Sequence, residues 1–281
     1  MARLTRIFAH CIVFSLTVLM GIAPAATRYV GSGETFTTIQ SAIDASSNGD
    51  TIIVRDGTYT GEGNRDISFG GKAIHLKSEN GPTKAIIDVQ GSQSDPHRGF
   101  IFQWGEGDTT VVDGFTIRNG CSTKGAAVYC YNGSSPLITR NVITQNLSTT
   151  WDGGAINCAE GAPSFTYNTI SLNHSEYGAI GISCERSSPS VLHNTISGNS
   201  SIGLYSNAGS PVIVGNLVAD NGMGLVCRSS AAISHNVVRD NDSEGIDCDA
   251  GSINRVQSAV RRLGAGEPDR AHDRERRRHV L

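Results

Sequence analysis

Short runs of alternating apolar and polar residues fill the middle of the chain, and most of them end at an asparagine. The clearest copy, SPLITRNVITQN, covers residues 135–146, and similar segments begin at residues 162, 188, 210 and 230. Alternation of this kind predicts short β-strands. A repeat in the twenties of residues with variable length predicts a solenoid whose turns differ mainly in loop size.

Each copy carries two asparagines five residues apart. We expect them to lie at bends between strands, where they tolerate left-handed backbone geometry and their amides can bond to the turns above and below. This structural role is favoured over ligand binding for all ten positions: Asn141, Asn146, Asn168, Asn173, Asn194, Asn199, Asn216, Asn221, Asn236 and Asn241. One turn earlier, Gly114 and Asn119 are expected to take the places of the pair.

One helix is predicted before the repeats, over TFTTIQSAIDAS from Thr35 to Ser46. Phe36, Ile39 and Ile43 share one face at helical spacing. An amphipathic helix here would cover the open end of a solenoid core, which would otherwise recruit other chains.

The order of motifs extends this reading. TIQSAID, GDTIIV, DGTY and GFTIRNG are followed by a train of N-x-I/V-x-x-N segments, and over residues 29–252 this order resembles the right-handed parallel β-helix superfamily, the pectate-lyase-like solenoids of exported bacterial proteins. The resemblance implies an all-β, right-handed parallel β-helix of about nine turns with a short N-terminal capping helix, over residues 27–252. It also implies a frequent role in binding or cutting polysaccharide, although a fold alone assigns no function.

Residues 1–26 have the pattern of an export signal. Arg3 and Arg6 precede an apolar run, and Ala23-Pro24-Ala25 supplies the small residues of a cleavage site. The alternative is a membrane anchor, for which the run is short. No second apolar run follows, so we expect a monomer without a transmembrane segment in the mature chain, located in the periplasm, at the cell surface or outside the cell.

Charge is unevenly distributed along the chain. The formal net charge of −3 combines +2 over residues 1–6, −9 over residues 7–252 and +4 over residues 253–281, where eight arginines stand against four acids. The acidic body argues against nucleic acid as a partner. The irregular Arg-rich tail is read either as a basic disordered segment or as the product of a shifted reading frame or truncation, and we favour the second hypothesis.

The cysteines that follow the signal share one repeat position in five of six cases. These are Cys130, Cys158, Cys184, Cys227 and Cys248, with Ser206 in the remaining copy. Side chains stacked in parallel register point the same way, so a buried ladder of free thiols is favoured over disulfides.

Candidate chemistry lies where the repeat is interrupted, between Gly91 and Asp113. Asp95, His97 and Arg98 bring an acid, an imidazole and a guanidinium within four residues, and Trp104 could stack on a sugar ring. A polar surface loop in which Arg98 pairs with Asp95 is favoured over such a cleft.

A second acidic segment, with Asp240, Asp242 and Glu244, resembles the start of a Ca²⁺-binding loop. It has Gly251 where the bidentate glutamate of such a loop would stand. A solvated acidic turn is therefore favoured, and we expect no cofactor, with Ca²⁺ as the alternative.

These observations favour an exported β-helix protein that binds polysaccharide or acts as a cell-surface module, without demonstrated catalysis. One alternative is a polysaccharide lyase or glycoside hydrolase with its site near residues 95–98, which would require acids beside a base or two flanking carboxylates. Another is a structural surface scaffold. The paired-Asp and Gly-His-Gly signatures of galacturonase-type enzymes are missing.

Overall fold

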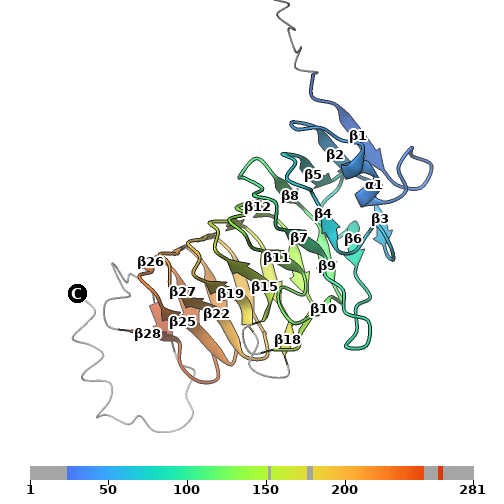
Figure 1. The fold of residues 1–281 in the computed structure, drawn as a ribbon. Helices are drawn as coiled ribbons and strands as arrows, with labels where there is room; N and C mark the ends of the chain where they lie inside the picture. Colours follow the sequence, from blue (N-terminus) through green and yellow to red (C-terminus); the bar gives the residue numbers. More distant parts are fainter. Residues whose placement is uncertain (1–23, 151–152, 176–179, 250–258, 262–281) are drawn as a thin grey trace, which may run out of the picture.

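The chain winds into a parallel β-helix, in which each strand pairs with the equivalent strand of the next turn (Figure 1). The computed structural model describes residues 24–150, 153–175, 180–249 and 259–261. All pairings between the named strands of this part are parallel, as in β12 (Leu137–Thr139) against β16 (Ser164–Thr166). The predicted all-β solenoid is confirmed.

Three long sheets form the walls of the solenoid. Sheet A contains β1 (Thr27–Val30), β2 (Thr51–Val54), β5 (His75–Ser78), β8 (Val111–Asp113), β12, β16, β20 (Ser190–Leu192), β23 (Val212–Val214) and β26 (Ala232–Ser234). Sheet B contains β3 (Gly57–Tyr59), β6 (Ala85–Asp88), β9 (Thr116–Arg118), β13 (Val142–Thr144), β17 (Thr169–Ser171), β21 (Thr195–Ser197), β24 (Leu217–Ala219), β27 (Val237–Arg239) and β29 (Ala259–Arg261).

Sheet C carries the longest strands. It contains β4 (Ile67–Ser68), β7 (Phe100–Phe102), β11 (Val128–Cys130), β15 (Gly154–Ala159), β19 (Ile180–Glu185), β22 (Ile202–Asn207), β25 (Met223–Arg228) and β28 (Ile246–Cys248). A short sheet of β10 (Cys121–Ser122), β14 (Leu147–Ser148) and β18 (His174–Ser175) lies beside these walls.

The core is a stack of inward side chains, one set from each turn. Ile138 aligns with Phe165, and Phe165 with Val191, and all three are fully buried. Ile143 and Ile170 do the same in sheet B. Burial of each such side chain contributes about 1.5–3 kcal/mol, so every turn adds its own share to one continuous core.

The capping helix α1 (Ile39–Asp44) is shorter than predicted. Phe36 forms a parallel β-bridge with Val30, so the first residues of the expected helix are extended instead. Thr38 then caps the helix by accepting a hydrogen bond from Ser41 N at 3.4 Å. Ile39 and Ile43 are buried in the core at the N-terminal end, where α1 contacts β1, β2 and β4.

The ten repeat asparagines form two hydrogen-bonded ladders. In the first, Asn141 N and Asn141 Nδ2 both donate to Asn168 Oδ1, at 3.0 and 3.2 Å, and Asn141 Nδ2 also donates to Val112 O of the preceding turn. Asn146 donates to Asn173 in the same way in the second ladder. Nine of the ten are buried, and Asn241 is half-buried.

The left-handed bend lies one residue earlier than predicted. The residue before each ladder asparagine has positive φ, for example Arg140 at 54° and Gln145 at 56°. The same correction applies one turn earlier: Phe115 and Gly120, rather than Gly114 and Asn119, take the ladder positions, and their backbone N–H groups donate to the Oδ1 atoms of the next turn's asparagines. Gly114 and Asn119 hold the bend itself.

The five aligned cysteines form the predicted ladder of free thiols. Cys130 pairs in register with Cys158, and Cys158 with Cys184; Ser206 continues the column, followed by Cys227 and Cys248. All are unbridged, and Cys248 alone among them is half-buried rather than buried.

Two sequence predictions fall largely outside the described residues. The export signal lies there except for residues 24–26, and so does the Arg-rich tail except for β29. β29 pairs in parallel with β27, and the boundary at residue 252 stays a prediction. In the part of the chain that the structure describes, no helix has the length and hydropathy needed to cross a membrane.

Candidate functional site

The outer side of sheet C brings together aromatic and charged side chains from turns that are distant in sequence. Tyr129 lies on β11 and Tyr131 directly after it, two residues apart, so both point outward from the strand. Their rings stack with centroids 4.7 Å apart and an interplanar angle of 18°. We call Tyr129, Tyr131 and the three charged residues described next the sheet C face.

Three charged side chains flank the two rings. The Arg98 guanidinium lies 5.4 Å from the Tyr129 ring centroid, and Arg98 Nε donates to Lys124 O at 2.8 Å. Lys124 Nζ reaches across β15 to Glu185 and donates to both carboxylate oxygens at 2.9 Å. Burial is the main cause that raises the pKa of Tyr129 above its ordinary value, so this side chain is neutral at neutral pH.

His97 lies at the strand-start edge of this face, between two carboxylates. Its Nδ1 bonds Asp66 and its Nε2 lies 3.1 Å from Asp95 Oδ1. Asp66 also accepts a hydrogen bond from Arg98 N at 2.9 Å, and Arg65 lies 3.6 Å from Asp95. Asp95 thus pairs with Arg65 and His97, and the expected pairing of Asp95 with Arg98 is wrong.

This arrangement limits the chemistry of His97. Both ring nitrogens already bond carboxylates, so neither faces open space from which it could take a substrate proton. Asp66 and Asp95 flank an imidazole that fills the gap a sugar or water would need between two glycosidase carboxylates. The network therefore fastens the loop before β7 to β4.

Trp104 lies at the other end of β7 from His97, so the structure does not bring it into the same cluster. Its side chain is 64% exposed. The buried Glu106 carboxylate fixes the turn behind it by accepting hydrogen bonds from Gly71 N, Trp104 N and Ser134 Oγ at 3.1, 2.9 and 2.8 Å. The Trp104 backbone is thus held in place by Glu106, while its ring is exposed at the edge of sheet C where the strands end.

The acidic segment near the end of the described solenoid is not assembled into a cation site. The Asp240 carboxylate pairs with the neighbouring Arg239, while Asp242 N donates to Asn221 O and Glu244 N to Ser243 Oγ. Across the described ranges, no group of three His, Cys, Asp or Glu side chains has the arrangement of a metal site.

Sequence reasoning missed most of the sheet C face. Tyr129, Tyr131, Lys124, Glu185 and Asp66 were not singled out. A signal for the tyrosines was available, because they alternate with Cys130 in YCY and Cys130 marks an inward position of the repeat. Residues on either side of an inward position must point outward, so the segment encodes an outward-facing aromatic pair.

Comparison with known proteins addresses the fold. A family model described as a right handed beta helix region matches residues 171–260. The chain has a right-handed parallel β-helix fold. No curated protein matches the chain.

Solved structures similar to this β-helix include three carbohydrate-active enzymes. They are a pectin methylesterase from carrot (12% identity, TM-score 0.43, covering 88% of this chain and 84% of that one) and a pectin methylesterase from Aspergillus niger (17%, 0.35, 88% and 88%). The third is a mannuronic acid specific polysaccharide family 6 lyase from human gut microbiota (12%, 0.22, 90% and 94%).

Proposed function

We propose that the protein is an exported polysaccharide-binding β-helix and that the sheet C face holds the sugar chain. The stacked Tyr129–Tyr131 pair carries this proposal. Aromatic rings offer flat apolar surfaces that suit the C–H faces of sugar rings, and a tyrosine adds a polar hydroxyl. Arg98, Lys124 and Glu185 supply donors and acceptors for sugar hydroxyls around the rings.

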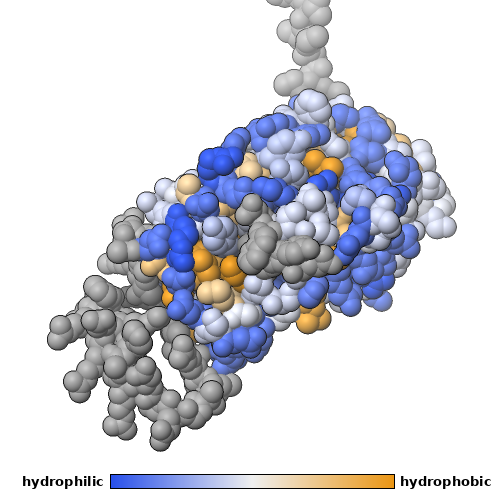
Figure 2. Space-filling model, turned by 60° about the horizontal axis from the view of Figure 1, so that its bottom comes forward, coloured by the Kyte–Doolittle hydropathy of each residue, from blue (hydrophilic) through white to orange (hydrophobic). Residues whose placement is uncertain are grey.

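The side chains of the sheet C face are held in fixed positions, which favours binding. Lys124 and Glu185 hold each other, and Arg98 is fixed by a backbone carbonyl and by the Tyr129 ring. A ligand therefore meets groups that are already ordered, which lowers the entropic cost of binding. Figure 2 shows one side of the molecule, on which hydrophilic residues surround smaller hydrophobic patches.

The engaged state of His97 favours binding over catalysis. A lyase would need a free base beside the substrate, and both His97 nitrogens are occupied. Arg98 is likewise engaged with Lys124 O. A polysaccharide lyase or glycoside hydrolase stays the alternative function for this edge of sheet C.

A glycan array followed by affinity measurements tests the proposal. We expect binding to one or more polysaccharides, and Tyr129→Ala or Tyr131→Ala should weaken it about tenfold, since about 1.4 kcal/mol corresponds to a factor of ten. Tyr167→Ala is the matched control, because Tyr167 is an exposed tyrosine outside sheet C, at the bend between β16 and β17. No binding on the array, or unchanged affinity in both variants, would contradict the proposal.

The enzyme alternative has its own assay. Polysaccharides that bind are incubated with and without Ca²⁺, and unsaturated or reducing ends are measured. Turnover that disappears in His97→Ala or Arg98→Ala, with the circular dichroism spectrum unchanged, would establish catalysis at this edge and replace the binding proposal.

A further inference from the structure

A hollow on sheet A arises where one bend position lacks a side chain. The bend residues Gly114, Arg140, Tyr167 and His193 follow β8, β12, β16 and β20, whose register places them on successive turns. All four have positive φ. Three of them carry large side chains, and the Tyr167 and His193 rings stack with centroids 5.2 Å apart. At Gly114 this row of large bend side chains is interrupted, because glycine has none.

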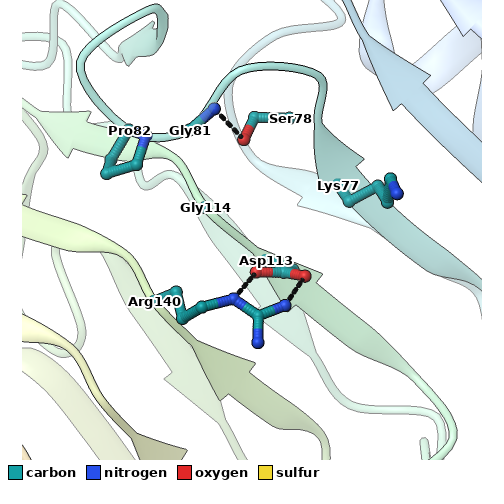
Figure 3. A pocket seen from close by; sticks show the side chains of 7 residues that line it. All are labelled: Lys77, Ser78, Gly81, Pro82, Asp113, Gly114 and Arg140. Atoms are coloured by element: carbon teal, nitrogen blue, oxygen red, sulfur yellow. Dashed lines mark hydrogen bonds and ion pairs between the residues drawn. The ribbon is translucent and has the colours of Figure 1, made fainter.

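The interruption leaves a cavity of about 240 Å³ in the surface (Figure 3). It is lined by Lys77, Ser78, Gly81, Pro82, Asp113, Gly114 and Arg140. A Cβ atom at position 114 would come within 2.6 Å of Ser78 Oγ, so a side chain there would displace the Ser78 hydroxyl. The loop after β5 forms one wall, and Arg140 of the following turn forms another.

Ion pairing fixes the Arg140 wall. Arg140 Nε and Nη2 both donate to the Asp113 carboxylate, and His75 Nε2 lies 3.4 Å from Asp113 Oδ2. Burial raises the pKa of Asp113, but the hydrogen bonds from His75 and Arg140 outweigh it and hold that pKa below its ordinary value. Asp113 is therefore ionised at neutral pH.

Lys77, on β5, carries a positive charge that no other residue lining the cavity neutralises. It is aligned with Asp113 across β5 and β8, yet no acid of the described chain pairs with its ammonium group. The nearest acid in sequence, Glu79, is held by Arg55, and Asp113 is used by Arg140. The charges of Asp113 and Arg140 cancel, so with Lys77 the residues lining the cavity have a net charge of +1.

We propose that this cavity binds a small carboxylate ligand, with Lys77 Nζ donating to its oxygens. The charge of one carboxylate equals the charge that Lys77 leaves uncompensated, whereas a phosphate group carries about −1.5 to −2 at neutral pH. Ser78 Oγ accepts a hydrogen bond from Gly81 N, so its own proton is available to a ligand oxygen. The cavity is smaller than the roughly 300–1,000 Å³ of drug-sized sites, which limits the ligand to about one building block.

This site is separate from the sheet C face, and the inference does not rest on polysaccharide binding there. Chemical-shift titrations of the ¹⁵N-labelled protein test it directly, with the amides of Gly81 and Gly114 as reporters. The probes are glucuronate (a ring with a carboxylate), acetate (the carboxylate without the ring), glucose (the ring without the charge) and inorganic phosphate.

We expect saturable shifts of both amides with glucuronate and acetate, none with glucose, and weaker binding of phosphate. Lys77→Ala should weaken glucuronate binding about tenfold, the value of one charge-assisted hydrogen bond. Lys84→Ala removes the same charge from an exposed position on the same loop outside the cavity and should leave the affinity within about twofold. No saturable shift with either carboxylate, equal affinity in Lys77→Ala, or tighter binding of phosphate would overturn the proposal.

Discussion

Replacing Asn194 with alanine removes the central member of one asparagine ladder. The Asn194 side chain accepts hydrogen bonds from Asn168 N and Asn168 Nδ2, at 2.9 and 3.1 Å. Its own amide donates to Phe165 O, Leu192 O and Asn216 Oδ1. One substitution therefore cuts bonds to the turn before and the turn after.

The loss in free energy of unfolding follows from the hydrogen-bonding groups that stay buried without partners after the substitution. Asn168 N–H loses its acceptor in a site that water does not reach, and an unsatisfied buried donor costs about 1–3 kcal/mol. The two hydrogens of Asn194 Nδ2 contribute about 0.5–1.5 kcal/mol each. The sum is about 2–6 kcal/mol, a large part of the roughly 5–15 kcal/mol that stabilises a typical domain.

Equilibrium urea unfolding followed by circular dichroism measures this loss. Asn207→Ala is the matched control, because Asn207 lies on the same turn at the exposed end of β22. Surface substitutions of this kind change stability by about 0.5 kcal/mol or less. If Asn194→Ala lost no more stability than Asn207→Ala, the ladder would not stabilise the solenoid and the reasoning would be refuted.

Two further predictions concern ionisable groups. The backbone N–H groups of Ser47 and Ala26 and the Arg28 guanidinium lower the pKa of Asp50 below 3.8. Its stabilising effect should be complete at neutral pH and fade as pH falls below that value, so the difference in melting temperature between wild type and Asp50→Ala should shrink from about pH 7 to about pH 3; a constant difference would contradict this. Burial raises the pKa of Cys130, and the hydrogen bond with Cys158 together with burial raises that of Cys184. Both thiols should resist alkylation in the native protein and react in denaturant, as read by mass spectrometry; native labelling at Cys130 would show that the core opens.

The sequence repeat predicted the parts of the structure that recur once per turn. The asparagine ladders and the cysteine column could be read directly, because a residue at a fixed repeat position must stack on its equivalents in the neighbouring turns. The bend was misplaced by one residue because the left-handed backbone position does not require one residue type. Arginine, tyrosine, histidine and glycine all occupy it.

Features that join different turns could not be read in the same way. Asp66 and His97 are 31 residues apart, and Lys124 and Glu185 are 61 apart. Loops of variable length separate them, so the repeat does not say which outward side chains become neighbours. The expected helix is shorter for a different reason, since Phe36 forms a β-bridge with Val30, six residues earlier, which helical periodicity does not encode.

At each bend, two neighbouring residues have different structural roles, and this difference has an evolutionary consequence. The asparagine holds the turns together from inside, while the residue before it faces solvent and needs only to accept a left-handed backbone. Substitutions in that row can alter the surface without touching the core or the ladders. The solenoid therefore offers a line of positions, one per turn, at which new recognition properties can arise independently of the stability of the protein.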